Sequence, residues 1–238
     1  MRGEAPAVVN GRLEGRPALE VLQWAAATYP GRVTFGTGFG VEGCLLVHLI
    51  ATARLSIDLY TLDTGLLFQE TYELWRRLER RYAVSIRGVR PEQSVAEQEA
   101  SHGAALWERR PDLCCSLRKV APQREAVAGY DAWISAIRRD QTAERGATPV
   151  VHGDARFGVV KINPLAAWTA EDVWRFVREH DVPYNSLHDR GYPSIGCAPC
   201  TTPVAPGEDP RAGRWRGREK QECGLHGRLA ERLLTLKE

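Results

Sequence analysis

The residues of this chain with the most specific chemistry are its cysteines. Five of the six fall into three groups: the tandem pair Cys114 and Cys115, the Cys-x-x-Cys pair Cys197 and Cys200, and the single thiol of Cys223. Two thiol pairs brought together by the fold form a soft ligand set that suits an iron–sulfur cluster or zinc. A redox dithiol is the main alternative for the Cys-x-x-Cys pair. Cys223 stands apart and is free to act as a nucleophile.

Positive charge gathers just ahead of Cys223. The run contains Arg211, Arg214, Arg216, Arg218 and Lys220. Guanidinium groups there could hold a phosphate or a sulfate. In isolation such a run is more often a solvated basic tail, but its place beside a cysteine favours the anion site. The sixth cysteine, Cys44, lies in an apolar stretch and is predicted to pack in the core.

A glycine-rich turn, Gly36-Thr37-Gly38-Phe39-Gly40, joins a predicted strand to a predicted helix. Backbone N–H groups at such a turn suit a phosphate, although a turn of this kind can also serve only to pack helix on strand. It is neither a Walker loop nor the dinucleotide fingerprint. The neighbouring strand ends in Leu62-Asp63-Thr64-Gly65, at the edge where open α/β sheets bind ligands. Together the two segments predict a nucleotide site.

Two arginines and a glutamine follow another predicted strand. Arg138, Arg139 and Gln141 come directly after the apolar run 131–136, again at the expected ligand edge. Paired guanidinium groups suit an anionic substrate, although arginines after a strand are often simply solvated. We therefore expect these side chains to contribute to the same anion site.

Short apolar runs alternate with amphipathic stretches over the first two thirds of the chain, as in a sheet built from βα units. Strands are predicted at 32–35, 56–62, 83–87 and 131–136, a hairpin at 149–162, and helices at 41–53, 67–82, 94–107, 113–128 and 169–180. Beyond Pro183 proline, glycine and arginine dominate. The pattern predicts an α/β fold with an open, mainly parallel sheet and flanking helices over 1–203, followed by a mobile C-terminal arm over 204–238.

Composition limits the class of protein. With 238 residues, of which 43% are hydrophobic and 26% charged, the chain can form one sizeable core. The net charge of +2 gives no general reason to expect nucleic-acid binding. No apolar stretch is long enough for a membrane span, and the N-terminus lacks a signal-peptide pattern. We therefore expect a cytosolic location, where thiols stay reduced and serve as ligands or catalysts rather than disulfides.

Ordered motifs between about residues 32 and 226 carry a family resemblance. They are Leu62-Asp63-Thr64-Gly65, Cys114-Cys115-Ser116-Leu117-Arg118-Lys119, Arg138-Arg139-Asp140-Gln141, Val182-Pro183-Tyr184-Asn185-Ser186-Leu187-His188-Asp189, Gly191-Tyr192-Pro193-Ser194-Ile195-Gly196-Cys197 and Glu222-Cys223-Gly224-Leu225-His226. In these motifs the chain resembles the assimilatory adenylyl-sulfate reductases of the wider phosphoadenylyl-sulfate reductase family. The resemblance implies an adenine nucleotide alpha hydrolase-like fold.

The resemblance also implies an activity. The expected reaction reduces adenylyl sulfate to sulfite and AMP, through an S-sulfocysteine on Cys223 that thioredoxin or a glutaredoxin-like dithiol resolves. Adenylyl sulfate is expected to be preferred over its 3′-phosphorylated form.

Roles for individual residues follow from the same likeness. Cys114, Cys115, Cys197 and Cys200 would hold a [4Fe–4S] cluster, and Lys119 would link that cluster to the substrate. Arg211 and Arg214 match the arginines that hold substrate oxyanions. His226 would help to close the arm or tune the Cys223 thiol.

Two departures from the family pattern change the expected contacts. Gly36, Gly38 and Gly43 stand where the family's loop carries serines and an acidic residue, so phosphate would rely on backbone N–H groups, Thr37 and the arginines. The segment 135–137 replaces the usual Thr-Gly-x before the arginine pair.

Three alternatives remain at the level of sequence. One is a reductase for the 3′-phosphorylated nucleotide, a branch that generally lacks the paired cysteines. Another is a zinc-stabilised nucleic-acid-binding module, which would leave the motif at 222–226 unexplained. The third is an adenylating enzyme of the pyrophosphatase type on a similar fold, which would not need the C-terminal thiol. A homo-oligomer is compatible with the sequence.

Overall fold

The computed structural model describes residues 4–220 and 222–226. A six-stranded sheet with the order β3-β2-β1-β4-β6-β5 forms the centre of this part of the chain. The parallel strands are β1 (Val33–Gly36), β2 (Asp58–Leu62), β3 (Ile86–Val89), β4 (Ala132–Ile134) and β6 (Val159–Ile162). The edge strand β5 (Val151–Asp154) pairs antiparallel with β6. Because the order reverses between β1 and β4, a crevice opens beyond their carboxyl ends.

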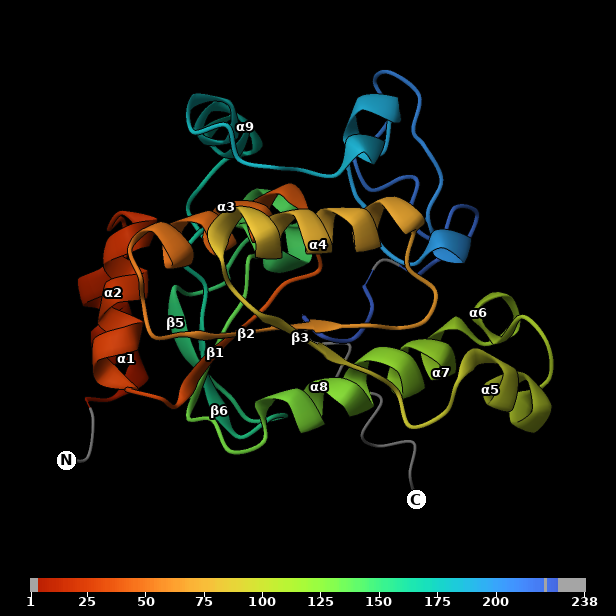
Figure 1. The fold of residues 1–238 in the computed structure, drawn as a ribbon, viewed down its shortest axis with the longest axis horizontal. Helices are drawn as coiled ribbons and strands as arrows, with labels where there is room; N and C mark the ends of the chain where they lie inside the picture. The colour runs from red at the N-terminus through yellow and green to blue at the C-terminus, as the bar shows by residue number, and fades with distance from the viewer. Residues whose placement is uncertain (1–3, 221, 227–238) are drawn as a thin grey trace.

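Helices cover both faces of this sheet (Figure 1). On one side lie α1 (Pro6–Leu13), α2 (Ala18–Thr28), α3 (Val41–Thr52), α4 (Gln69–Tyr82) and α9 (Ala170–Glu179). On the other side α8 (Ala121–Val127) continues a helical stretch that begins with α7 (Pro111–Cys115). The arrangement is a three-layer α/β fold with an open, mainly parallel sheet, as the sequence predicts.

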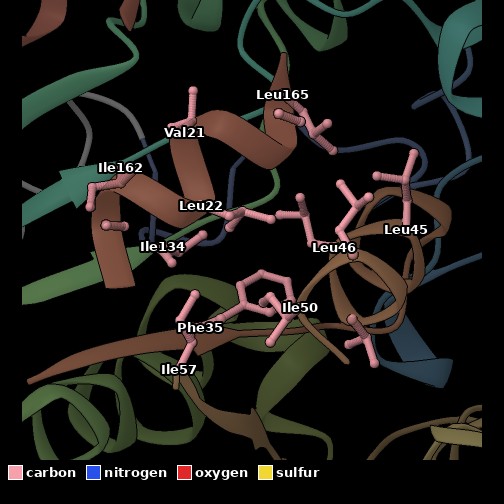
Figure 2. Close-up of a cluster of buried hydrophobic side chains, with 14 of the residues drawn as sticks. Val21, Leu22, Phe35, Leu45, Leu46, Ile50, Ile57, Ile134, Ile162 and Leu165 are labelled. Carbon is pink, nitrogen blue, oxygen red and sulfur yellow. The ribbon is translucent and has the colours of Figure 1, made fainter. Parts of the chain in front are cut away.

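The first side of the sheet, here called the core face, is apolar. Phe35, Ile134 and Ile162 point from three neighbouring strands toward Leu22 of α2 and Leu46 of α3 (Figure 2). All five side chains are fully buried. Each contributes roughly 1.5–3 kcal/mol by leaving water. This layer therefore provides much of the fold's stability.

The opposite side, here called the second face, mixes apolar and polar groups. Tyr60, Trp133 and Val159 form a smaller cluster with Ala126 and Val127 of α8. Lys161 faces the same way, because it stands beside Trp133 in the register of β4 and β6. A buried lysine in a central strand is unusual and needs a partner.

Several predicted boundaries shift for local backbone reasons. The helix expected at 94–107 is divided into α5 (Val95–His102) and α6 (Leu106–Arg109), because Gly103 adopts a φ of 78°. The strand expected at 83–87 begins three residues later, since Ala83 ends α4 in the left-handed region with φ 51°. The expected helix start at Thr169 is confirmed, with a capping box to Asp172. The sequence did not indicate α1 and α2.

Between α7 and α8 the helix passes through a π-helical turn over Ser116–Val120. The expected helix at 113–128 is thus continuous but locally widened. Such turns are rare and are often found at functional sites. Here the turn carries Arg118 and Lys119, directly after the tandem cysteines.

Residues 204–220 contain turns and no regular helix or strand. They pack on the body of the chain, with the Trp215 side chain buried and its backbone N–H donating to the Cys200 carbonyl at 3.0 Å. The mobility of an arm over 204–238, and the boundary at 203, stay predictions. Residues 221 and 227–238 of that arm lie outside the described part of the chain.

No helix among the described residues combines the length and the hydropathy needed to cross a membrane. The cytosolic location stays a prediction.

Candidate active site

A cavity of about 230 Å³ opens at the crevice beyond β1 and β4. Its walls come from the loops after β1, β2 and β4, from the π-helical turn and from the C-terminal end of the described chain. The predicted site residues that line it are Gly36, Thr37, Gly38, Leu62, Thr64, Lys119, Cys197, Arg211, Arg214, Cys223 and His226. Segments far apart in the sequence therefore meet at the edge where α/β sheets bind ligands.

The glycine-rich turn forms one wall of the cavity. Its shape is fixed by two bonds, from the Thr37 N–H to the Tyr60 carbonyl at 2.9 Å and from the Phe39 N–H to Thr37 Oγ1 at 3.1 Å. Phe39 adopts a φ of 57°, which is uncommon for a residue with a side chain. A Cβ at Gly36 would lie 2.6 Å from the Tyr60 hydroxyl, so glycine lets Tyr60 reach the cavity.

The four paired thiols line a second, smaller cavity next to the first. Cys114 and Cys115 end α7, and Cys197 and Cys200 lie in a turn that pairs with Leu67. Thr64 Oγ1 lies 3.4 Å from Cys197 Sγ. The predicted meeting of the two pairs is thus present in the structure. No group of three or more His, Cys, Asp or Glu side chains within residues 4–220 and 222–226 is arranged to hold a metal ion.

Burial raises the pKa of Cys115 to about 12, and it also raises the pKa of Cys114 and of Cys200. Thiols in such surroundings ionise readily only when a cation or a metal balances the charge. Apolar side chains, including Trp107 and Trp215, share the lining of this cavity. Four thiols are a donor set of the kind that an iron–sulfur cluster takes.

Two cations, Arg118 and Lys119, lie beside the thiol pairs. Arg118 is buried and donates to the Thr64 carbonyl at 2.6 Å and to Gln98 Oε1 at 3.1 Å. Burial opposes the charge of Lys119, but the thiols of Cys197 and Cys223 outweigh it and raise the pKa of Lys119. Lys119 is therefore a firm positive charge at the junction of the two cavities.

The Cys223 segment, residues 222–226, closes one side of the large cavity. The Arg145 guanidinium donates two hydrogen bonds to the buried Glu222 carboxylate, at 2.9 and 2.8 Å, and Arg211 lies 3.5 Å from the same group. The neighbouring Cys223 is partly buried. Burial opposes its ionisation, but Lys119 and the Leu225 backbone outweigh burial and lower the pKa of Cys223.

His226 ends the described chain against the second face of the sheet. Its ring stacks on Trp133, with ring centres 5.6 Å apart and an interplanar angle of 11°. Its Nδ1 lies 3.0 Å from Lys161 Nζ. Burial and the positive charges of Lys161 and Arg145 hold the pKa of His226 well below its usual range. The imidazole is therefore neutral at pH 7.

Arg214 reaches the cavity across a glycine. A Cβ at Gly196 would collide with its guanidinium group, so glycine before Cys197 makes room for the arginine. The guanidinium donates to Ser194 Oγ and to the Ile195 carbonyl at 3.4 Å each, while its buried Nε has no partner. An anion in the cavity would supply one.

Other predicted residues do not line the cavity. They are Phe39, Gly40, Asp63, Gly65, Arg138, Arg139 and Gln141. Asp63 accepts from the Tyr72 hydroxyl at 2.6 Å and from Arg90 at 3.0 Å. Arg139 forms two bonds to Glu14, at 2.7 and 2.9 Å. The charges of Asp63 and Arg139 are thus already paired with other residues of the chain, so these two side chains serve to hold loops around the cavity.

The sequence patterns did not indicate several of the residues that line the cavity. Tyr60, Gln123, Trp133, Arg145 and Glu222 all contribute to the cavity wall. Two of them stand beside motifs already noted, since Arg145 comes four residues after Gln141 and Glu222 precedes Cys223. Tyr60 and Trp133 looked like ordinary strand residues, so only the alternation of strand side chains could have placed them on one face.

Comparison with known proteins agrees with this geometry. The family model described as the phosphoadenosine phosphosulfate reductase domain matches residues 32–203. The chain belongs to the phosphoadenosine phosphosulfate reductase family. It is 48% identical to an adenosine 5′-phosphosulfate reductase of Halalkalibacterium halodurans, covering 92% of this chain and 95% of that protein. It is 47% identical to adenosine 5′-phosphosulfate reductase 1 of Bacillus subtilis, covering 88% and 90%.

Solved structures add two comparisons. The phosphoadenylyl-sulfate reductase of Candida auris superimposes with a TM-score of 0.74 at 34% identity, covering 82% of this chain and 95% of that one. The FMN adenylyltransferase of Candida glabrata has a TM-score of 0.58 at 14% identity, covering 100% and 83%, and shares the fold alone. The resemblance in the motifs is thereby confirmed, and with it an oxidoreductase of the phosphoadenosine phosphosulfate reductase family.

Proposed function

We propose that this chain reduces adenylyl sulfate to sulfite and AMP, with Cys223 as the nucleophile. The observation that carries the proposal is a single cavity, at the nucleotide edge of the sheet, where Cys223 meets Lys119 and Arg214. The choice of adenylyl sulfate rests on the bacterial relatives, which are adenosine 5′-phosphosulfate reductases.

In the first step the Cys223 thiolate attacks the sulfur of the sulfo group. A new S–S bond forms, the bond from that sulfur to the bridging phosphate oxygen breaks, and AMP leaves with the electron pair. The attack brings an anion toward an anion, so cations must converge on the reacting atoms. Lys119, Arg211 and Arg214 line the cavity and meet this need.

In the second step a dithiol of the thioredoxin or glutaredoxin type supplies two electrons. Its thiolate attacks Cys223 Sγ in the adduct, and sulfite leaves with the electrons of the S–S bond. The second thiol then resolves the mixed disulfide and restores the Cys223 thiol. Sulfur is thereby reduced, and the dithiol is oxidised.

Cys114, Cys115, Cys197 and Cys200 would hold a [4Fe–4S] cluster in this proposal. The fit rests on four thiols that line one small cavity together with Lys119. When bound, the cluster would join α7 to the turn at Cys197 and place its charge next to that lysine. Anaerobically purified protein should contain iron and acid-labile sulfide, and Cys197→Ser should lose both.

The decisive experiment omits the dithiol. Protein mixed with adenylyl sulfate alone should release one equivalent of AMP and gain the mass of one SO₃ group on the peptide that contains Cys223. Added thioredoxin should then release sulfite. A Cys44→Ala variant is the matched control and should behave like the wild type, since Cys44 is buried in the core. An adduct on any other cysteine would disprove the assignment.

Reduction of the 3′-phosphorylated nucleotide is the second candidate, because the Candida auris structure carries that name. Values of kcat/KM for the two nucleotides, measured on one preparation, separate the candidates. We expect the higher value for adenylyl sulfate. The reverse order would assign the chain to the other substrate.

A further inference from the structure

Lys161 is the charged residue that the proposed reaction leaves unexplained. It lies in the middle of β6 and is only 2% exposed, although its neighbours on the second face include Trp133 and Val159. Burying an ammonium group is costly unless a partner compensates for the lost water. An apolar side chain at this position would avoid that cost, so the contacts of Lys161 indicate its role.

The contacts of Lys161 converge on one ring. Its Nζ lies 3.0 Å from His226 Nδ1 and 4.6 Å from the centre of the Trp133 ring. Trp133 in turn stacks flat against His226. Trp133 thus supports the face of the imidazole, and Lys161 binds its edge. Together they determine both the plane and the rotation of the ring.

The β5–β6 hairpin, which carries Lys161, also holds the backbone of the Cys223 segment. Arg156 donates to the carbonyl oxygens of Gly224 at 3.3 Å and of Leu225 at 3.1 Å. Asp154 holds the Arg156 guanidinium by bonds of 3.0 and 2.9 Å. The segment is therefore anchored by its backbone as well as by its terminal ring, and Cys223 lies one residue before the first of these anchors.

We propose that Lys161 and Trp133 are positioning residues that form a receptor for the His226 imidazole and thereby hold Cys223 at the cavity. The proposal rests on the function proposed above and adds two residues to it. Lys161 does not line the cavity, and Trp133, which forms part of its wall, acts in this proposal through the imidazole. Their effect passes through His226, which lines the cavity.

The receptor also selects the tautomer of His226. When Lys161 is protonated, its ammonium group has only hydrogens to donate, so Nδ1 of the neutral ring then accepts from Lys161. The ring proton is then on Nε2. An imidazole in this form can donate a hydrogen bond from Nε2 to an oxygen in the cavity, which the other tautomer could not do.

The test compares four variants with the wild type. Lys161→Met keeps an unbranched stem and loses the donor, and Trp133→Leu loses the stacking surface. His226→Asn keeps an acceptor near the position of Nδ1, whereas His226→Ala removes the ring. Two rates are measured: alkylation of Cys223 in the free protein, followed by peptide mass, and formation of the SO₃ adduct in one turnover at saturating adenylyl sulfate.

We expect Lys161→Met to slow adduct formation by ~10-fold to 100-fold, because a small misplacement of a reacting group has effects of this size. Alkylation of Cys223 should become faster, while iron content and nucleotide affinity stay unchanged. Trp133→Leu and His226→Ala should likewise slow adduct formation and speed alkylation of Cys223. Lys161→Met combined with His226→Ala should form the adduct no more slowly than His226→Ala alone. His226→Asn should retain slow alkylation.

Two results would overturn the proposal: wild-type rates of both reactions in Lys161→Met, or fully additive losses in the double variant. Alkylation is measured without a nucleotide, so it decides the positioning role even if no adduct forms. Absence of the adduct in the wild type would instead count against the proposed function. A thermal melt of each variant excludes loss of the fold as the cause.

Discussion

The two faces of the sheet are closed by different forces. On the core face, apolar side chains such as Phe35, Leu46 and Ile134 meet helices that are continuous with the βα units. On the second face, beyond the reach of α8, the Cys223 segment is held by Arg145, Lys161 and other charged groups. Apolar burial has no preferred direction, whereas hydrogen-bonded ion pairs fix one geometry.

This difference separates stability from chemistry. A layer held by apolar contacts tolerates apolar substitutions that conserve volume and gives little control over the position of any one atom. A layer held by paired charges adds little net stability, since the cost of desolvating the charges offsets their attraction. It does, however, fix the positions of its groups within a small volume. The residues of the reaction are therefore expected on the second face, and the energy of the fold on the core face.

The largest effect is expected from Cys223→Ser. The serine hydroxyl is scarcely ionised at neutral pH, so sulfite formation should fall by at least about 10³-fold. Iron content and nucleotide binding should stay near those of the wild type, because the change leaves both thiol pairs intact. Sulfite release under anaerobic conditions measures the effect. A serine variant with ordinary turnover would show that the second face does not carry the chemistry.

Phe35→Ala tests the opposite face. The side chain is fully buried, and its loss should lower the free energy of unfolding by about 3–5 kcal/mol. Urea unfolding followed by tryptophan fluorescence measures this value. In the folded variant Cys223 should be alkylated at the wild-type rate. A change in that rate would show that the two faces are coupled and would weaken the comparison.

Glu222→Gln tests the ion pair between Glu222 and Arg145. The two side chains are 3% and 8% exposed, respectively. The amide keeps the shape but loses the charge, which should weaken closure of the Cys223 segment by about 1.5–3 kcal/mol. Hydrogen exchange at residues 222–226 should rise accordingly, while exchange in β1 and β4 should not change. Combining Glu222→Gln with Arg145→Met should restore part of the protection, because it also removes the Arg145 charge that would otherwise stay buried without its carboxylate.

The most gradual effect concerns pH. Burial, helped by the charge of Arg156 and opposed by Asp154, lowers the pKa of Lys161 to about 7. In the unfolded chain a lysine has a pKa of about 10.4, so above pH 7 the unfolded state binds more protons than the folded state. The contribution of Lys161 to stability should then rise with pH, by up to about 1.4 kcal/mol per unit. Urea midpoints between pH 7 and 9 should rise less steeply in Lys161→Met than in the wild type.

The core face and the thiol pairs could be predicted from the sequence because their signals are local. Strand alternation and glycine turns located β1 and β2, and the spacing of Cys197 and Cys200 indicated a shared site. The partners of charged residues could not be predicted in this way. Arg139 was expected at the substrate, but it pairs with Glu14, which is 125 positions away.

The same reason explains why Lys161 was missed. Its partner His226 is 65 positions later in the chain, and no periodicity links a strand to a segment without regular structure. Ion pairs of this kind depend on the closing of the whole fold, so they become visible only in three dimensions.

The size of the cavity has a consequence for the order of events. A volume of about 230 Å³ admits a nucleotide fragment but not a second protein, and Cys223 lies on its wall. In the proposed mechanism a protein dithiol would therefore reach the sulfur only after AMP has left. The two substrates would then never occupy the enzyme together. Steady-state kinetics should accordingly give parallel lines in double-reciprocal plots. This is the pattern of a ping-pong mechanism, in which the modified Cys223 thiol keeps the sulfo group after AMP has left and before the dithiol binds.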